Sequence, residues 1–267
     1  MSGITLGPLV LAMDRFAFIA GAISFLALIS LIGCSRRAAK GLDGWGTLTL
    51  LTGVIAARLS HVARHLDIYA QDPLSAFAFW QGGFDPLAGL GAVALLLAVL
   101  TLRRQTRVTE GLMAASLAGL LVWQGILQMT PAPDMPLPAI RFAALDGPPV
   151  ALSSTAGEPV VINLWATWCP PCRRELPMMM EISEGQPDVR VVFLNQGEFG
   201  PDVRQYLLRE GLPTDRVLLD PSRDAMAHFE TPGLPATLFF SSNGTLEDVH
   251  LGEISRAAFQ SRLQSLR

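Results

Sequence analysis

The chain is poor in cysteine and in charged side chains, and both shortages narrow the classes of protein that it can encode. Three cysteines in 267 residues are too few for a fold held together by disulfides. Charged residues make up 16% of the chain, against about 25% in ordinary soluble domains, which counts against a purely cytosolic globular protein. The net charge of -3 lacks the basic footprint of a nucleic-acid-binding protein.

Half of the residues are hydrophobic, which excludes a disordered chain, and the length leaves room for two domains at most. Charge is divided unevenly between the two halves. Residues 1–130 hold 9 Lys and Arg against 6 Asp and Glu, a net of +3, whereas residues 131–267 hold 11 against 17, a net of -6. The proline-rich residues 131–138 predict a stiff linker between an N-terminal domain, 1–130, and a C-terminal domain, 139–267.

The N-terminal domain contains long uncharged segments that predict membrane-spanning helices. Three segments have 17 to 23 residues and a weaker fourth has 14: Phe16–Gly33, Pro86–Leu102, Gly111–Pro133 and Gly44–Ala57. At about 1.5 Å per residue, the longer segments can cross a hydrocarbon core of about 30 Å. We therefore expect an α-helical membrane domain of about four spans in the lipid bilayer, with both ends of the domain on the same side.

The orientation of these spans follows from basic loops at residues 34–40 and 103–107, which fall on one side of a four-span arrangement. The positive-inside rule makes that side cytoplasmic, so the N-terminus and the C-terminal domain are expected outside. In a bacterium this describes a multi-pass protein of the inner membrane with a periplasmic domain. Cleavage as a lipoprotein at Cys34 is the alternative, but Asp14 and Arg15 replace the basic cluster that a signal segment needs.

Four short motifs occur in the membrane domain: Leu6–Leu9, Ala56–Leu59, Asp72–Leu74 and Trp80–Gly83. Together they resemble the first third of prolipoprotein diacylglyceryl transferases, over roughly residues 4–100. The family's histidine-glycine-glycine segment is replaced by Leu87–Leu90, and its later spans with the essential arginines have no counterpart. The resemblance therefore implies a truncated, repurposed anchor without transferase activity.

Arg58, His61 and His65 follow the spacing of one helix face near the outer surface. Such a set is typical of a haem, metal or lipid-headgroup site, or of an interfacial face whose polar ends stay in water. Two histidines without a third ligand favour the interfacial face.

The most informative stretch of the sequence surrounds a pair of cysteines. Val160–Trp165 is an apolar, β-branched run that predicts a buried strand. Pro170 and Pro171 are tolerated in the first turn of a helix, so Cys169 is expected at the mouth of a helix that follows this strand. The helix dipole and free amides there lower the pKa of a thiol. Cys172 lies one turn further, close enough for a disulfide.

A zinc site and a purely structural disulfide are the alternatives for this pair. A structural zinc needs two further ligands, and His228 and His250 stand alone. A disulfide that closes so small a loop adds little stability through chain entropy. Redox exchange through a mixed disulfide is the better explanation, and no metal or cofactor is expected.

This motif resembles the thioredoxin superfamily and, more closely, its TlpA/ResA-type disulfide reductases, over residues 136–267. Phe142–Leu152 looks like the N-terminal hairpin of that group, and Gly233–Leu238 looks like its cis-proline loop. The resemblance implies an α/β thioredoxin-like fold whose cis-proline loop faces the cysteine pair and binds the extended backbone of the substrate. The substrate-binding residues that it implies are Trp168, Pro170, Pro171, Leu234 and Pro235. Further strands are predicted at 190–195, 216–220, 237–241 and 246–251, and further helices at 201–210, 222–229 and 256–266.

Two positions refine the expected chemistry. Thioredoxin proper has a buried aspartate six residues before its first cysteine, and this position is Asn163 here. Glu175, one helical turn beyond Cys172, matches the acid of the TlpA/ResA motif. We expect Glu175 to accept the proton of Cys172, with an ordinary solvent-facing glutamate as the alternative. The run Met178–Met180 is either a soft contact surface or helix core.

These features predict a membrane-anchored, periplasmic thiol-disulfide oxidoreductase in which Cys169 attacks a protein disulfide and Cys172 resolves the mixed disulfide. The resemblance to TlpA/ResA proteins implies that it works as a reductase. The resemblance implies apocytochrome c or copper-site cysteines as substrates, and thus cytochrome c biogenesis. Cys34 is the lone cysteine of the membrane domain, so a separate membrane donor of the DsbD/CcdA type must return the electrons. The alternatives are a disulfide oxidase or isomerase, and a redox-sensing module with a functional membrane half.

Overall fold

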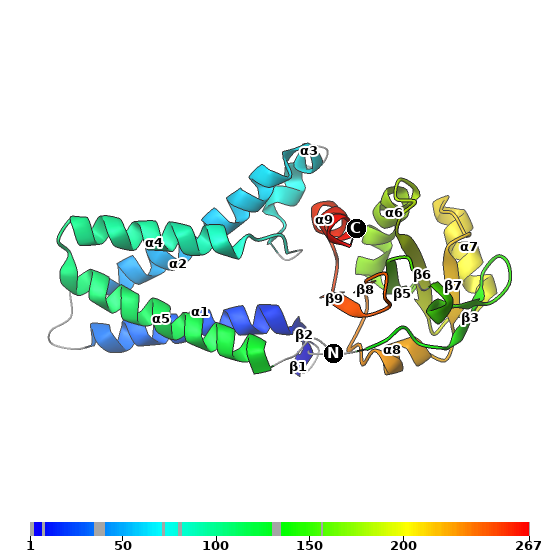
Figure 1. Cartoon of the computed structure of the whole chain (residues 1–267), viewed down its shortest axis with the longest axis horizontal. Coiled ribbons are helices and arrows are strands. Elements are labelled where there is room, and N and C mark those ends of the chain that lie inside the picture. Colours follow the sequence, from blue (N-terminus) through cyan, green and yellow to red (C-terminus); the bar gives the residue numbers. More distant parts are fainter. Residues whose placement is uncertain are drawn as a thin grey trace. The chain divides into compact units, whose positions relative to one another are not determined.

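The computed structural model describes residues 3–6, 9–34, 41–70, 73–79, 82–129, 135–155 and 157–266. It divides the chain into a helical unit, Met13–Phe79 with Gly83–Pro131, and a unit built mainly on Ala132–Arg267 (Figure 1). Several parts of the predicted motifs lie outside the described residues: Gly7, Pro8, Asp72, Trp80 and Gln81, the basic loop 35–40 and the first half of the linker.

The helical unit contains four long helices, which run side by side in Figure 1: α1 (Met13–Gly33), α2 (Leu42–Arg64), α4 (Pro86–Leu102) and α5 (Thr106–Met129). A pair of short antiparallel strands, β1 (Gly3–Leu6) and β2 (Leu9–Ala12), precedes α1. The helix α3 (Leu66–Tyr69) and a 3-10 turn at Pro73–Phe77 follow α2.

Three of the described helices, α1, α2 and α5, are long and apolar enough to cross a membrane, whereas α4 is apolar but has 17 residues. The segment Gly44–Ala57 therefore belongs to a longer span than its 14 uncharged residues predict. The reason is that neither flanking charge ends the helix: Asp43 lies in the first turn of α2, and Arg58 is buried within it.

Glycines allow the helices to approach closely. A Cβ atom on Gly21 of α1 would lie 2.8 Å from the carbonyl oxygen of Gly119 on α5. A Cβ atom on Gly119 would likewise lie 2.8 Å from the carbonyl oxygen of Gly21. Gly89 of α4 approaches the carbonyl oxygen of Gly53 on α2 in the same way. Small residues at such crossings are typical of helix pairs in membranes, where close van der Waals packing replaces the hydrophobic effect.

The prediction that Arg58 lies on an interfacial helix face with its polar end in water is wrong, because this residue is 4% exposed. Its Nε and Nη1 donate hydrogen bonds to the carbonyl oxygens of Ala76 and Gly83, at 3.0 and 2.8 Å. Its guanidinium also lies over three aromatic rings, those of Tyr69, Phe79 and Phe84. The rings of His61 and His65 lie 4.5 Å apart, and the searched residues contain no group of three metal-binding side chains. The segment between α2 and α4 thus encloses Arg58.

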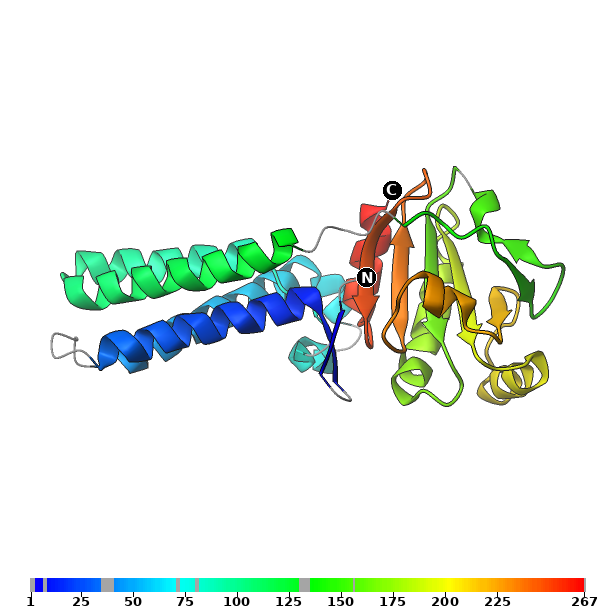
Figure 2. The same ribbon diagram turned by 90° about the horizontal axis from the view of Figure 1, so that it is seen from below.

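The described residues of the C-terminal unit form a mixed sheet with the strand order β4-β3-β7-β6-β5-β8-β9 (Figure 2). The strands are β3 (Arg141–Ala144), β4 (Val150–Ala151), β5 (Val160–Trp165), β6 (Arg190–Gln196), β7 (Val217–Asp220), β8 (Ala236–Phe240) and β9 (Leu246–Leu251). The helices are α6 (Pro170–Glu184), α7 (Gly200–Glu210), α8 (Asp224–His228) and α9 (Arg256–Ser265), with a 3-10 turn at Leu152–Thr155. These bounds agree with the predicted strands and helices to within two residues.

The central strand β5 is buried on both faces, as its continuous apolar run predicts. Val161 and Trp165 point into a core shared with α6, α7 and α9, whereas Ile162 and Leu164 point into a second core with α8. Because side chains alternate along a strand, Asn163 lies on the same face as α6.

The predicted hairpin is confirmed by the antiparallel pairing of β3 with β4, and Gly147 adopts a φ of 104° in the turn. The described end of the predicted linker packs on this unit, since Pro136 bridges to Thr245 and Leu137 lies against the core.

Candidate active site

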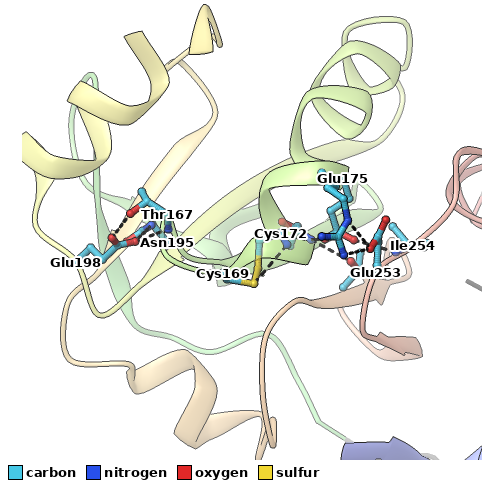
Figure 3. Close-up of a disulfide and its surroundings, with 11 residues drawn as sticks. Thr167, Cys169, Cys172, Glu175, Asn195, Glu198, Glu253 and Ile254 are labelled. Carbon is cyan, nitrogen blue, oxygen red and sulfur yellow. Dashed lines mark hydrogen bonds and ion pairs between the residues drawn. A yellow bond between two sulfur atoms is a disulfide. The ribbon is translucent and has the colours of Figure 1, made fainter. Parts of the chain in front are cut away.

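Helix α6 begins directly after the short loop that leaves β5, and the two cysteines lie at this junction (Figure 3). Cys169 is the N-cap residue of α6 and is joined by a disulfide to Cys172 in the first turn. The Sγ of Cys169 accepts a hydrogen bond from the N–H of Cys172 at 3.3 Å, so a sulfur takes the place of a capping oxygen. Pro170 and Pro171 occupy the first turn, where no intrahelical donor is lost. The predicted place of Cys169 at a helix mouth is confirmed.

The two sulfurs differ in their access to a partner. Cys169 is 3% exposed and Cys172 is completely buried. Trp168, immediately before Cys169, is exposed, and so is Pro170. Of the two cysteines, Cys169 alone keeps some exposed surface.

The cis-proline loop lies at the same end of the sheet as the cysteines. The peptide bond between Leu234 and Pro235 is cis. Strand β8 runs antiparallel to β5 with Ala236 opposite Leu164, so the loop that precedes β8 lies beside the end of β5. Leu234 also packs against the hydrophobic cluster that contains both cysteines.

Glu175 is buried on α6, three residues beyond Cys172, with 2% of its surface exposed. Its Oε1 accepts a hydrogen bond from the Nδ2 of Asn163 at 3.0 Å. Its Oε2 accepts another from the backbone N–H of Ile254, in the loop between β9 and α9, at 2.8 Å. The alternative of a solvent-facing glutamate is therefore wrong.

Burial raises the pKa of Glu175 to about 8, because the carboxylate loses its hydration. The hydrogen bonds from Ile254 and Asn163 act in the opposite direction, the charge of Glu253 adds to the rise and the guanidinium of Arg174 reduces it. In the oxidised protein at neutral pH the carboxyl group is mostly protonated. A pKa this close to neutrality suits a group that exchanges a proton during a reaction.

Asn163 connects Glu175 to the centre of the sheet. Its Nδ2 also donates a hydrogen bond to the Oγ1 of Thr237, which lies opposite it on β8, at 3.1 Å. A neutral amide donates to Glu175, which an ionised aspartate at this position cannot do. Glu175 therefore has a neutral amide beside it, where an aspartate at position 163 would add a second buried carboxyl group.

Sequence patterns do not predict a second carboxylate near the cysteines, that of Glu198. Its Oε2 accepts hydrogen bonds from the backbone N–H of Thr167 at 2.7 Å and from the Nδ2 of Asn195 at 2.8 Å. Its Oε1 accepts a hydrogen bond from the hydroxyl group of Thr167. Gly197, with a φ of 79°, turns the chain after β6 toward this loop. The parallel pairing that places Asn195 beside Trp165 brings these groups together, and it is visible only in the structure.

Other side chains of α6 lie further from the disulfide. Arg174 pairs with Glu253 at 2.6 Å on the exposed side of the site, and the guanidinium of Arg173 lies over the ring of Tyr206. Met179 and Met180 are buried in the core, so most of the methionine run is helix core rather than a contact surface.

Comparison with known proteins adds an independent line of support. Residues 132–263 match the family model of redoxins. The chain is 29% identical over 143 residues to the thioredoxin-like protein YneN of Bacillus subtilis. The matched residues cover 52% of this chain and 80% of YneN.

Two relatives are oxidoreductases by name. The thiol-disulfide oxidoreductase ResA of Geobacillus kaustophilus is 28% identical over 132 residues, covering 49% of this chain and 75% of ResA. The thiol:disulfide interchange protein DsbE of Escherichia coli is 28% identical over 134 residues, covering 49% of this chain and 71% of DsbE. These matches fall on the unit whose helix mouth carries the disulfide. The C-terminal half of the chain is therefore a redoxin domain, and it makes the protein a thiol-disulfide oxidoreductase of the thioredoxin superfamily.

Proposed function

We propose that the protein is a membrane-anchored reductase of protein disulfides outside the cytoplasm. In this proposal Cys169 is the nucleophile, Cys172 is the resolving thiol and Glu175 takes up the proton of Cys172. The observation that carries the proposal is the buried carboxyl group of Glu175 beside the cysteine pair, with a pKa of about 8. Such a pKa matches the task of moving a thiol proton near neutral pH.

The reaction begins with both cysteines reduced. The Cys169 thiolate attacks one sulfur of the partner's disulfide, so that a bond forms between them and the partner's second sulfur leaves as a thiolate. Cys172 then gives its proton to the Glu175 carboxylate, and its thiolate attacks the sulfur of Cys169. The bond between Cys169 and the partner's sulfur breaks, this sulfur leaves as a thiolate, and both thiolates of the partner take up protons. Two electrons have moved to the partner, and Cys169 and Cys172 end in the disulfide of the present structure.

The partner's contacts are assigned to the residues that flank Cys169. Trp168 and Pro170 are exposed on either side of it, Pro171 follows, and Leu234 and Pro235 lie at the same end of the sheet. We expect an extended segment of the partner to lie along the loop of Leu234 and Pro235 while its cysteine reaches Cys169.

Membrane anchoring is supported by the helical unit. Its helices expose large apolar side chains, among them Ile23, Leu31 and Leu121, which suit hydrocarbon better than water. The 17 residues of α4 extend about 26 Å, close to the hydrocarbon thickness of about 30 Å, so we count α4 as the fourth span. We therefore propose an even number of spans with the basic loops inside, and with them a redoxin domain in the bacterial periplasm. We assign the transferase-like motifs to this anchor.

The supply of electrons has to come from a separate protein. Cys34 is the free cysteine among the described residues, and the sequence has no second cysteine in its first half with which it could form a redox pair. A membrane dithiol donor of the DsbD/CcdA class would reduce Cys169–Cys172 again. Apocytochrome c and copper-site cysteines are the proposed substrates.

Trapping tests this proposal. In cells that produce the full chain, Cys172→Ser should accumulate mixed disulfides between Cys169 and its partners, and a thiol reductant should release them. The double variant Cys169→Ser, Cys172→Ser is the matched control and should trap nothing. A complete absence of adducts would overturn the assignment of Cys169.

The direction of transfer is tested by the reduction potential of the cysteine pair. A reductase predicts a value of about -270 mV, whereas a value of about -120 mV would show a disulfide oxidase instead. A Cys169→Ser strain that keeps its phenotype would point to a module whose membrane half is the functional part.

A further inference from the structure

The described part of the redoxin domain exposes two aromatic side chains, one directly before Cys169 and one directly after Glu198. Among the described residues from 135 to 266, the exposed large hydrophobic side chains are Trp168, Phe199 and Leu208, at 59%, 68% and 69%. The other large apolar side chains of this part are at least partly buried. Exposed aromatic rings next to a reactive group indicate a surface that a partner covers.

Hydrogen bonds bring Phe199 and Trp168 to the same end of the sheet. Phe199 directly follows Glu198, and Trp168 directly follows Thr167. The Glu198 carboxylate binds both the backbone N–H and the hydroxyl of Thr167, which ties the end of β6 to the loop before Cys169 (Figure 3). The two rings are therefore carried by two loops that one carboxylate holds together.

The Glu198 carboxylate is fully engaged in this link. It accepts three hydrogen bonds, two from Thr167 and one from the Nδ2 of Asn195 at 2.8 Å. Phe199 begins α7 as its N-cap and makes no capping bond with its side chain. The side chain of Phe199 thus caps no helix, and it lies outside the buried clusters of the described core.

We propose that Phe199, together with Trp168, binds an apolar side chain of the disulfide-bearing polypeptide next to its reacting cysteine. Glu198 is the positioning residue that holds Phe199 there. The occupant is the polypeptide substrate because Trp168 directly precedes Cys169, and the hydrogen bonds of Glu198 to Thr167 hold the loop of Phe199 to the same segment. A polypeptide whose disulfide meets Cys169 therefore lies against these loops. This inference rests on the proposed function in one respect, that Cys169 is the attacking thiol.

The test compares two cystine peptides that differ only beside the cysteine, one with leucine and one with serine. Pre-reduced full-length protein in detergent is mixed with each peptide and with hydroxyethyl disulfide, and single-turnover rate constants are measured. The wild type should prefer the leucine peptide. Phe199→Ala should lower the rate with the leucine peptide about tenfold and leave the serine peptide and hydroxyethyl disulfide within about twofold.

Two further variants sharpen the comparison. Leu208→Ala removes an equally exposed apolar side chain from α7 and should leave all three rates unchanged. Glu198→Gln replaces an oxygen acceptor by a donor, so it should reduce the preference for the leucine peptide even though Phe199 is present.

The outcomes separate this inference from the proposed function. An unchanged preference in Phe199→Ala overturns the inference, as does an equal loss with all three disulfides, which would show damage to the site itself. If Phe199→Ala instead altered only self-association or binding to lipid vesicles, the surface would serve a second copy or the membrane, and the inference would fail. The proposed function fails separately if wild-type protein reduces none of the disulfides, or if Cys169→Ser reduces them as well.

Discussion

Replacing Glu175 with glutamine should change how the stability of the oxidised redoxin domain depends on pH. The carboxyl group of Glu175 is 2% exposed, and its pKa rises from 4.5 to about 8 in the folded protein. At about 1.4 kcal/mol per pKa unit, this rise corresponds to about 5 kcal/mol.

The sign of the effect follows from where the proton is held. Below about pH 4.5 both the folded and the unfolded chain hold it. Between about pH 4.5 and about pH 8 the folded protein keeps a proton that the unfolded chain releases, so the free energy of unfolding falls as the pH rises. Above pH 8 both states have lost the proton and the contribution of Glu175 is flat.

Glu175→Gln has no proton to hold, so it should lack this slope. The glutamine also loses one acceptor for Asn163 or Ile254, which costs about 1–3 kcal/mol at every pH. The slope, rather than the level, is therefore the quantity to compare. Relative to the wild type, the variant should gain about 4 kcal/mol in the free energy of unfolding from pH 5 to pH 8.

The assay is urea unfolding of full-length oxidised protein in detergent, followed by near-ultraviolet circular dichroism, at several values between pH 5 and pH 8. Glu184→Gln, at an exposed position near the end of the same helix, is the matched control and should follow the wild type. Parallel curves for the wild type and Glu175→Gln would refute the reasoning that the buried carboxyl group is protonated at neutral pH.

Two glycine substitutions give further predictions. Gly197→Ala would press a Cβ atom against the Arg223 side chain at a φ of 79°, so we expect a loss of about 1–3 kcal/mol in urea unfolding; wild-type stability would show that this turn relaxes freely. Gly119→Leu would push α5 away from α1, because even a Cβ atom there lies 2.8 Å from the carbonyl oxygen of Gly21. We expect this variant to aggregate or melt earlier in detergent, measured by gel filtration and thermal unfolding, whereas Gly125→Leu, at an open position on the same helix, should behave as the wild type.

Local patterns in the sequence predict the cysteine pair, the helix that it begins and the buried strand before it. Each of these depends on neighbouring residues: prolines in a first turn, a β-branched run and the position of the cysteines between them. The apolar segments of the first half are predicted for the same reason, since composition alone decides which stretches suit a membrane. The full length of α2 is not predicted in this way, because a charged residue such as Arg58 ends an uncharged run without ending a helix.

The sequence by itself thus determined that the protein carries a redox-active cysteine pair at a helix mouth, behind an apolar N-terminal half. Tertiary structure alone decided the surroundings of that pair. Burial in the folded domain raises the pKa of Glu175, and the hydrogen bonds that oppose this rise come from Asn163 and Ile254, which lie 12 and 79 residues away. Glu198 reaches Thr167 because β6 lies parallel to β5. The loss of hydration and the meeting of distant hydrogen-bonding groups are properties of packing, and no local pattern of residues encodes them.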